Sequence, residues 1–387
     1  MNQASDSIPP LVHAPGKGSA AWRLASPILA LALVAILIGQ CVVGALLPQE
    51  GLMGLDEIAA WQTRHPAVAA LARPMGGFHL FHSWPFLATI LLLAVNTLAC
   101  SLQRVLFRDA KPIKSASLGA FLAIHGSVIL ILAGAFVSAA TSMEGLVVLT
   151  EGQAIIECPD NYVKIAAGPL RRAPRESFTI RLTRVRQEFA AGQHPVSLAS
   201  DIEITRRNGS VWSNAVAVNQ PAAHQGVSIT QGETGFSPKL VVRSRDTGAT
   251  VLDTFIGLKT SRTPAGREYR DVLPPAYLGE LVYITFYPDF VAEGDSVRKT
   301  GDQVGNPLLV VATADADGHP ATGHRITLGS EARVGDYLFR FDDLRRWSAL
   351  KLARDPGYPI ICVAFVFGIA ALGLRYFPEM GDWLGRG

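Results

Sequence analysis

Four long apolar runs dominate the hydrophobic pattern of this chain. They cover residues 24–47, 84–102, 118–140 and 358–377. At about 1.5 Å per residue, a helix of this length crosses a hydrocarbon core of roughly 30 Å. The pattern therefore predicts four transmembrane helices. The first run is too long for the apolar core of a signal peptide, and a polar leader, residues 1–23, precedes it, so we expect a retained helix.

A different pattern fills residues 141–357, between the third and fourth apolar runs. Alternating or β-branched stretches recur there between turn signals such as Asn208-Gly209 and Asp317-Gly318. No helical period separates them, which favours a sandwich or an open barrel. The sequence thus predicts a large β-rich domain, whose clearest strands are 178–185, 213–218, 226–230, 239–243, 281–287, 308–312 and 336–341.

Basic residues in one short loop orient the predicted helices. The loop between the second and third runs holds one acid, Asp109, against the bases Arg104, Arg108, Lys111 and Lys114. Cytoplasmic loops carry such an excess of Lys and Arg. Four spans then leave the leader 1–23 and the tail 378–387 in the cytoplasm. The short loop 48–83 and the β-rich domain 141–357 are expected outside.

Composition agrees with a membrane protein and excludes several other classes. Hydrophobic residues make up 49% of the chain and charged residues 17%, whereas about 25% of an ordinary globular domain is charged. The net charge of +3 reflects topology and does not indicate nucleic-acid binding. Cys158 is the one cysteine of the β-rich segment, so that segment has no internal disulfide. The chain also has no Cys-x-x-Cys motif, which excludes a thioredoxin-like thiol exchanger.

Signatures of hydrolases, nucleotide-binding proteins and zinc proteases are missing from the sequence. We therefore assign no catalytic residue. His319 and His324 are spaced for a metal pair, but their setting around a proline and a glycine favours a turn.

His125 is the first candidate binding residue, because it lies inside the third apolar run. A titratable side chain there costs about 2 to 4 kcal/mol or more and usually has a partner or a function, and imidazole is a frequent ligand of haem iron. Asn96 lies at a similar depth, roughly 10 Å from the cytoplasmic end of its helix. We expect Asn96 to orient His125 beside a stripe of small residues, Gly119, Gly126, Ala133 and Gly134. The alternative is a polar pair that only joins two helices.

A second candidate site precedes the second apolar run, at the expected outer surface. His79, His82 and Trp84 lie close together among other aromatic residues. A spacing of three places the two histidines on one side of a helix, where they could receive a flat hydrophobic ligand. The alternative is an interfacial aromatic belt with incidental histidines.

These residues belong to a longer series of short motifs. The motifs are Gly44-Ala-Leu-Leu-Pro-Gln49, His82-Ser-Trp-Pro-Phe86, Asn96-Thr-Leu-Ala-Cys-Ser101, His125-Gly126, Glu151-Gly-Gln153, Val218-Asn-Gln-Pro221, Gly305-Asn-Pro307 and Arg354-Asp-Pro-Gly357. In this order along the four-span layout, the series resembles the ResB family of cytochrome c biogenesis proteins from about residue 24 to 377.

The resemblance implies a subunit of the system II cytochrome c synthetase, in the inner membrane of a bacterium with its β-rich domain in the periplasm. Such a subunit works with a ResC/CcsA-type membrane protein to export haem b and present it to apocytochrome c, which a thioredoxin-like protein keeps reduced. His125 matches the family's third-span histidine and would bind haem iron. Pro85 departs from the family, which usually has an aromatic residue there.

The resemblance also suggests a role for each histidine site. His125 would form the inner end of a haem relay, with His79 and His82 at the outer end, in a non-catalytic subunit of the haem lyase complex. Two other functions stay open at this point. One is a b-type electron-transfer subunit, and the other is a membrane-anchored assembly or sensor protein in which His125 is structural.

Overall fold

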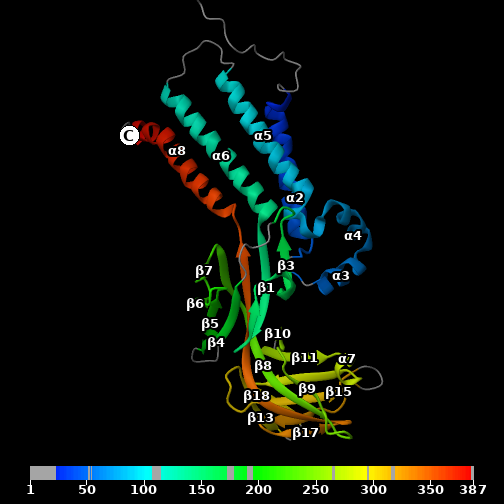
Figure 1. The fold of residues 1–387 in the computed structure, drawn as a ribbon. Coiled ribbons are helices and arrows are strands. Elements are labelled where there is room, and N and C mark those ends of the chain that lie inside the picture. The colour runs from blue at the N-terminus through cyan, green and yellow to red at the C-terminus, as the bar shows by residue number, and fades with distance from the viewer. Residues whose placement is uncertain are drawn as a thin grey trace, which may run out of the picture. The chain divides into compact units, whose positions relative to one another are not determined.

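The computed structural model describes residues 23–50, 53, 55–106, 115–171, 178–189, 195–263, 266–293, 296–314 and 319–384 (Figure 1). Two compact units divide the chain. The first comprises Met1–Glu144, Lys164–Ala173 and Arg354–Gly387, and the second comprises Gly145–Val163 and Pro174–Ala353. Most of the predicted leader, the end of the predicted tail and the basic residues Arg108, Lys111 and Lys114 lie outside the described residues.

Four helices in the described part of the first unit are long and apolar enough to cross a membrane. They are α2 (Pro27–Leu46), α5 (Trp84–Leu106), α6 (Ser115–Thr141) and α8 (Tyr358–Leu384). The expected helices are therefore present, but α5, α6 and α8 extend beyond the apolar runs. Hydropathy marks only the part of a helix that suits hydrocarbon, whereas backbone hydrogen bonds continue the helix through polar residues.

These helices pack side by side in the order α2, α5, α6, α8 (Figure 1). The contact between α6 and α8 is especially close, because a Cβ atom on Gly357 would lie 2.2 Å from the carbonyl oxygen of Gly134. Asp355 joins the same two helices. Its carboxylate accepts hydrogen bonds from the Ser138 hydroxyl at 2.7 Å and from the backbone N–H groups of Gly357 and Tyr358, where α8 begins.

The residues of the predicted small-residue stripe do not all pack against a neighbouring helix. Gly134 lies against α8, whereas no described atom outside the helix backbone would lie within 4 Å of an added Cβ on Gly119 or Gly126. A seven-residue spacing brings residues to one side of a helix, but it does not show which of them another helix covers.

The segment predicted as a short external loop, 48–83, contains several short helices. It contains α3 (Leu55–Arg64), α4 (Pro66–Ala72) and two 3₁₀ helices, η1 (Arg73–Met75) and η2 (Gly77–His82). Its hydrophobic cluster is small, and the buried members are Ile58, Ala69, Ala72 and Phe78. Such short elements bury too little apolar surface to give a strong periodic signal in the sequence.

The second unit is rich in β-strands, as predicted. One of its sheets contains β1, β18, β8 and β7 in that order, and the others have the orders β2-β4-β5-β6, β10-β11-β12-β15-β16 and β13-β14. The elements that follow α6 in the chain are β1 (Met143–Thr150), β2 (Ala154–Ile156), η3 (Pro159–Asn161), β3 (Lys164–Ala167), β4 (Thr179–Phe189), β5 (Pro195–Thr205), β6 (Val211–Ala217), β7 (Ala222–His224), β8 (Val227–Ser244), β9 (Thr250–Phe255), β10 (Lys259–Thr263), β11 (Gly266–Leu273), α7 (Pro275–Leu278), β12 (Val282–Tyr287), β13 (Asp289–Glu293), β14 (Ser296–Gly301), β15 (Leu308–Thr313), β16 (His324–Thr327), β17 (Glu331–Val334) and β18 (Tyr337–Arg354).

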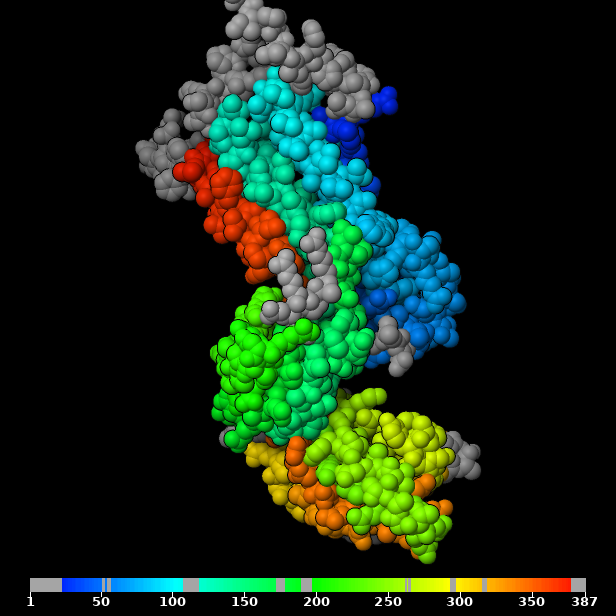
Figure 2. Space-filling model, viewed as in Figure 1, coloured from blue at the N-terminus to red at the C-terminus, as the bar shows by residue number. Residues whose placement is uncertain are grey.

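Two long antiparallel strands, β8 and β18, run through both hydrophobic cores of this unit. Ile229 and Leu352 belong to one core, and Leu240 and Phe339 belong to the other. In Figure 2 the two cores correspond to a green lobe and a yellow-to-orange lobe of the second unit. The sequence divides β8 into two predicted strands, 226–230 and 239–243, because glycines interrupt its alternation.

One of these glycines is required by packing. A Cβ atom on Gly235 would lie 2.5 Å from the Trp347 indole nitrogen. That nitrogen donates a hydrogen bond to the carbonyl of Leu258 at 2.9 Å. The glycine therefore makes room for a buried tryptophan within a continuous strand, rather than ending the strand.

Candidate functional site

A cavity of about 420 Å³ in the first unit contains both histidines of the predicted outer site. We call it the His82 cavity. Its volume falls within the range of about 300 to 1,000 Å³ that is usual for ligand sites. The lining side chains that could contact a ligand come from η1, η2 and the first turn of α5, and they are Arg73, Met75, His79, His82, Trp84 and Pro85.

His82 is held in a defined orientation. Its Nδ1 atom lies 2.8 Å from the carbonyl oxygen of Ala139, near the end of α6. A carbonyl can only accept a hydrogen bond, so Nδ1 carries the hydrogen and Nε2 of the neutral ring keeps its lone pair. Histidines that ligate metals are commonly oriented by such a bond from the other ring nitrogen. The ring of His82 is therefore prepared to act as a ligand.

His79 lines the same cavity but is held less firmly. Its backbone angles, φ −133° and ψ 43°, interrupt the helical geometry of η2. Its Nδ1 atom lies 3.6 Å from a carboxylate oxygen of Glu50, and about half of its side chain is exposed. Even between two full charges, an exposed contact of this kind contributes little, about 0 to 1 kcal/mol. The two histidines share a cavity although the segment between them is not a regular helix.

Gln49 is a positioning residue that the sequence analysis did not identify. Its side-chain amide donates to the carbonyl of Gly77 at 2.9 Å and accepts from the backbone N–H of Leu80 at 3.1 Å. The side chain is buried, and Glu50 adds a backbone bond to Phe78 at 2.9 Å. Gln49 thereby fixes η2, which carries both histidines. The only signal in the sequence was an amide directly after an apolar run, within one of the family motifs.

Trp84 lies at the rim of the cavity, at the first residue of α5, and 62% of it is exposed. Pro85 follows it and also lines the cavity. Proline is well tolerated in the first turn of a helix, where its missing N–H group has no partner to lose. Pro85 therefore leaves α5 intact, although it replaces the aromatic side chain that the family pattern leads us to expect.

His125 has the same hydrogen-bonding state as His82. Its Nδ1 atom lies 2.9 Å from the carbonyl oxygen of Phe121, one turn earlier on α6, which again leaves Nε2 of the neutral ring with a lone pair. The ring centres of Phe121 and His125 are 4.0 Å apart. The guanidinium carbon of Arg104 lies 4.6 Å from the centre of the Phe121 ring. His125 is half-buried.

Asn96 does not orient His125 in the way that the sequence analysis predicts. The Asn96 side chain is fully buried, and its amide nitrogen donates to the backbone carbonyls of Leu24 and Ser26. Its amide thus holds the start of α2, while His125 is bonded within α6. Depth along two helices can be read from the sequence, but the direction in which each side chain points around its helix cannot.

Replacing Asn96 with Leu should destabilise the protein without changing its haem absorption. The substitution removes the side-chain donor of the Leu24 and Ser26 carbonyls, of which Ser26 keeps the N–H of Ala30, so we expect a loss of about 1 kcal/mol. Thermal unfolding in detergent measures the loss. Ser101→Ala is the matched control, because Ser101 is also buried on α5 but donates to its own helix at Thr97. A change in haem absorption with unaltered stability would instead support the hypothesis that Asn96 orients His125.

The other histidines and the cysteines of the described chain form no metal-binding cluster. Among the described residues, no group of three or more His, Cys, Asp and Glu side chains is placed to hold a metal ion. His319 and His324 are not part of such a group, and all four cysteines are free.

Comparison with protein families decides what kind of chain this is. The model of the ResB-like family matches residues 28–111 and 115–379. The chain belongs to the ResB-like family. The resemblance seen in the sequence is therefore confirmed, and the matched region of this ResB-like chain includes His79, His82, Asn96 and His125.

Comparison with solved structures finds a protein described as cytochrome c haem lyase CcmF, with a TM-score of 0.27 and 13% sequence identity. The match covers 81% of this ResB-like chain and 34% of the CcmF chain. The chain thus spans about a third of the length of that protein. Comparison with curated proteins gives no match.

Proposed function

We propose that this ResB-like chain takes part in cytochrome c biogenesis, where it handles haem and docks apocytochrome c together with a ResC/CcsA-type membrane subunit. The observation that carries the proposal is the state of His82. Its Nδ1 atom is committed to Ala139, and the ring lines a cavity beside an exposed tryptophan. A neutral imidazole with a free Nε2 atom, next to an aromatic surface, suits an iron porphyrin.

The two oriented histidines belong to separate sites. The carbonyl that binds His82 is at Ala139, fourteen residues after His125 on α6, which corresponds to about 21 Å along a helix. At this separation, one haem iron cannot bind the rings of both His82 and His125. Two separate single-histidine sites favour transfer of haem along the membrane protein over a bis-histidine electron-transfer centre, which needs both axial ligands at one iron.

The other partners and the topology follow from the same proposal. The described chain offers free cysteines but no Cys-x-x-Cys pair, so a thioredoxin-like protein would keep the client cysteines reduced. The chain would lie in the inner membrane with both termini in the cytoplasm and its β-rich unit in the periplasm. His125 would then receive haem near the inner surface, and His82 would hold it near the outer surface, in a subunit that performs no covalent chemistry itself.

Haem that copurifies with the full chain tests this function. We expect haem in the complex with the ResC/CcsA-type partner, and less of it in the His125→Ala and His82→Ala variants. A bis-histidine haem that titrates reversibly in this chain alone would support electron transfer instead. Absence of haem from the complex would support the assembly or sensor function with a structural His125.

A further inference from the structure

Strand β8 has a gap in its hydrogen-bonding ladder. One edge of β8 pairs with β18 from Ser228 to Ser244, apart from a bulge at which Gly232 and Glu233 have no partner on β18. On the other edge, β7 pairs with Val227–Ile229, and the chain at Ile256 and Leu258 bonds to Pro238 and Phe236. In the part of the chain that the structure describes, no strand pairs with this edge between Thr230 and Gly235. An unpaired edge offers backbone groups to an added strand.

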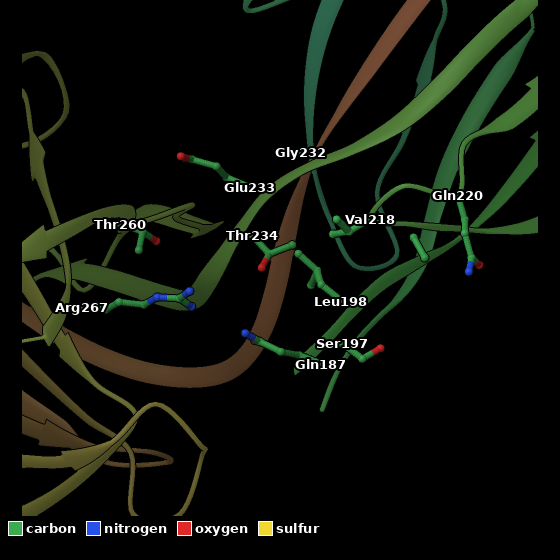
Figure 3. Close-up of a pocket in the computed structure, with 11 residues that line it drawn as sticks. Gln187, Ser197, Leu198, Val218, Gln220, Gly232, Glu233, Thr234, Thr260 and Arg267 are labelled. Atoms are coloured by element: carbon green, nitrogen blue, oxygen red, sulfur yellow. The ribbon is translucent and has the colours of Figure 1, made fainter. Parts of the chain in front are cut away.

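A cavity of about 800 Å³ lies along this gap (Figure 3), and we call it the β8 groove. Gly232, Glu233 and Thr234 of β8 line it. On one side is the hairpin of β10 and β11, where β10 is the end strand of its own sheet. On the other side are β4, β5 and the turn after β6. The six residues of the gap span about 20 Å, which is the length of an ordinary short strand.

Side chains in the groove supply both donors and acceptors. Arg267 and Gln187 reach into it from opposite sides, with Thr234 between them (Figure 3). The Gln187 side-chain oxygen accepts a hydrogen bond from Arg346, which leaves its NH₂ group to face the groove. Thr260 also lines the groove, and its hydroxyl is buried without a hydrogen-bond partner among the described residues.

Gln231 shows the same unmet hydrogen-bonding capacity beside the groove. Its amide nitrogen donates to the carbonyl of Gly232 at 3.2 Å and to the Ser348 hydroxyl at 2.8 Å. Its side-chain oxygen is buried without a partner. The Gln231 side chain thus bonds the Gly232 carbonyl within the gap, and its own oxygen is an acceptor without a donor. Buried polar atoms of this kind are normally satisfied. Here one belongs to a residue that lines the groove, and the other lies directly before the lining residue Gly232, which favours a polar ligand.

The chemistry of the lining identifies the class of ligand. Among the described residues that line the groove, none is His, Cys or Met, so it has no ligand for haem iron. Arg267 and Glu233 give it both signs of charge, which does not suit a purely anionic ligand. Peptide groups present donors and acceptors together, and an extended peptide presents them at the spacing of a strand edge.

We propose that the β8 groove binds an extended segment of unfolded polypeptide, which adds a strand to the free edge of β8 between Thr230 and Gly235. This inference rests on the proposed function, in which that polypeptide is the haem-free client cytochrome. Recognition through the backbone suits a protein that must accept different client sequences, since the hydrogen bonds of an added strand do not depend on the side chains.

Fluorescence anisotropy with the full-length protein in detergent tests the groove. The probe is a labelled, unfolded peptide that contains a reduced Cys-x-x-Cys-His motif. Val218→Trp fills the groove and should weaken binding by about tenfold or more. Val211→Trp is the matched control, because Val211 is equally exposed on β6 but does not line the groove, and it should bind as the unmodified protein does.

A modified peptide separates strand addition from side-chain binding. Methylation of alternate backbone nitrogens removes donors and keeps every side chain, so we expect binding to be lost. A scrambled peptide of the same composition should bind almost as well as the original. Equal binding of the methylated peptide, or unaltered binding by Val218→Trp, would overturn the proposal.

The same variants distinguish failure of this inference from failure of the proposed function. If Val218→Trp matures a client cytochrome normally while His82→Ala does not, the haem function stands and the groove does not serve it. If Val218→Trp loses peptide binding while both histidine variants retain maturation, the groove is a peptide site and the haem function is wrong.

Discussion

His82→Ala should reduce haem attachment to a client cytochrome c by at least about 100-fold, since even residues that only orient a metal ligand contribute 10- to 100-fold to affinity. The substitution removes the imidazole of the His82 cavity that a hydrogen bond to the Ala139 carbonyl orients. The measurement is covalent haem on a reporter cytochrome, in cells where this chain and its partner replace the host system. Added imidazole should restore part of the activity, because it can occupy the space that the side chain leaves.

His65→Ala is the matched control for this prediction. His65 lies in the same segment before α5, is exposed and does not line the cavity, so its removal should leave maturation unchanged. The amount of folded protein must be measured as well, because the lost bond to Ala139 alone costs about 1 kcal/mol. Normal maturation by His82→Ala, or a defect that imidazole does not relieve and that follows a fall in protein level, would show that His82 is structural.

The parts of the fold that the sequence predicts are those that depend on one-dimensional pattern. Four apolar runs gave four helices, and alternation in residues such as 281–287 and 308–312 gave β12 and β15. The small helices before α5 were missed, because their core rests on a few side chains such as Ile58 and Phe78. The continuity of β8 was missed for another reason. Gly235 resembles a strand break, but it accommodates Trp347 from the neighbouring strand, and that partner is distant in sequence.

In the candidate site, too, the features that depend on neighbours along the chain are predicted and those that depend on distant residues are not. The sequence brings His79 and His82 together because they are close along the chain, and one cavity does contain both. It cannot show that His82 is bonded to Ala139, 57 residues away, or that Gln49 fixes η2. It also paired Asn96 with His125 on depth alone, whereas the amide of Asn96 holds the start of α2. Proximity along the chain is readable from sequence, but the direction of a side chain requires the packed structure.

Gly134→Leu should destabilise the helical unit more than any other single glycine substitution in the membrane-spanning helix α6. A Cβ atom there would lie 2.8 Å from a side-chain carbon of Ile361, 3.1 Å from the Ile361 nitrogen and 3.2 Å from the Gly357 oxygen. Two of these atoms belong to the backbone of α8 or its start, so the helix itself must move. Overpacking of this kind costs about 1 to 3 kcal/mol or more. Thermal unfolding in detergent should show the loss as a lower midpoint.

Gly119→Leu is the control on the same helix, since nothing described lies within 4 Å of its added Cβ. It should preserve the midpoint, because leucine suits a helix surface in hydrocarbon better than glycine does. A double substitution then tests whether α8 has moved. Asp355 bonds Ser138 across the same contact at 2.7 Å, so Asp355→Ala should cost stability in the unmodified protein but little in Gly134→Leu, where that bond is already broken. Additive losses would show that α8 keeps its place and that the strain is absorbed by the side chain of Ile361 alone.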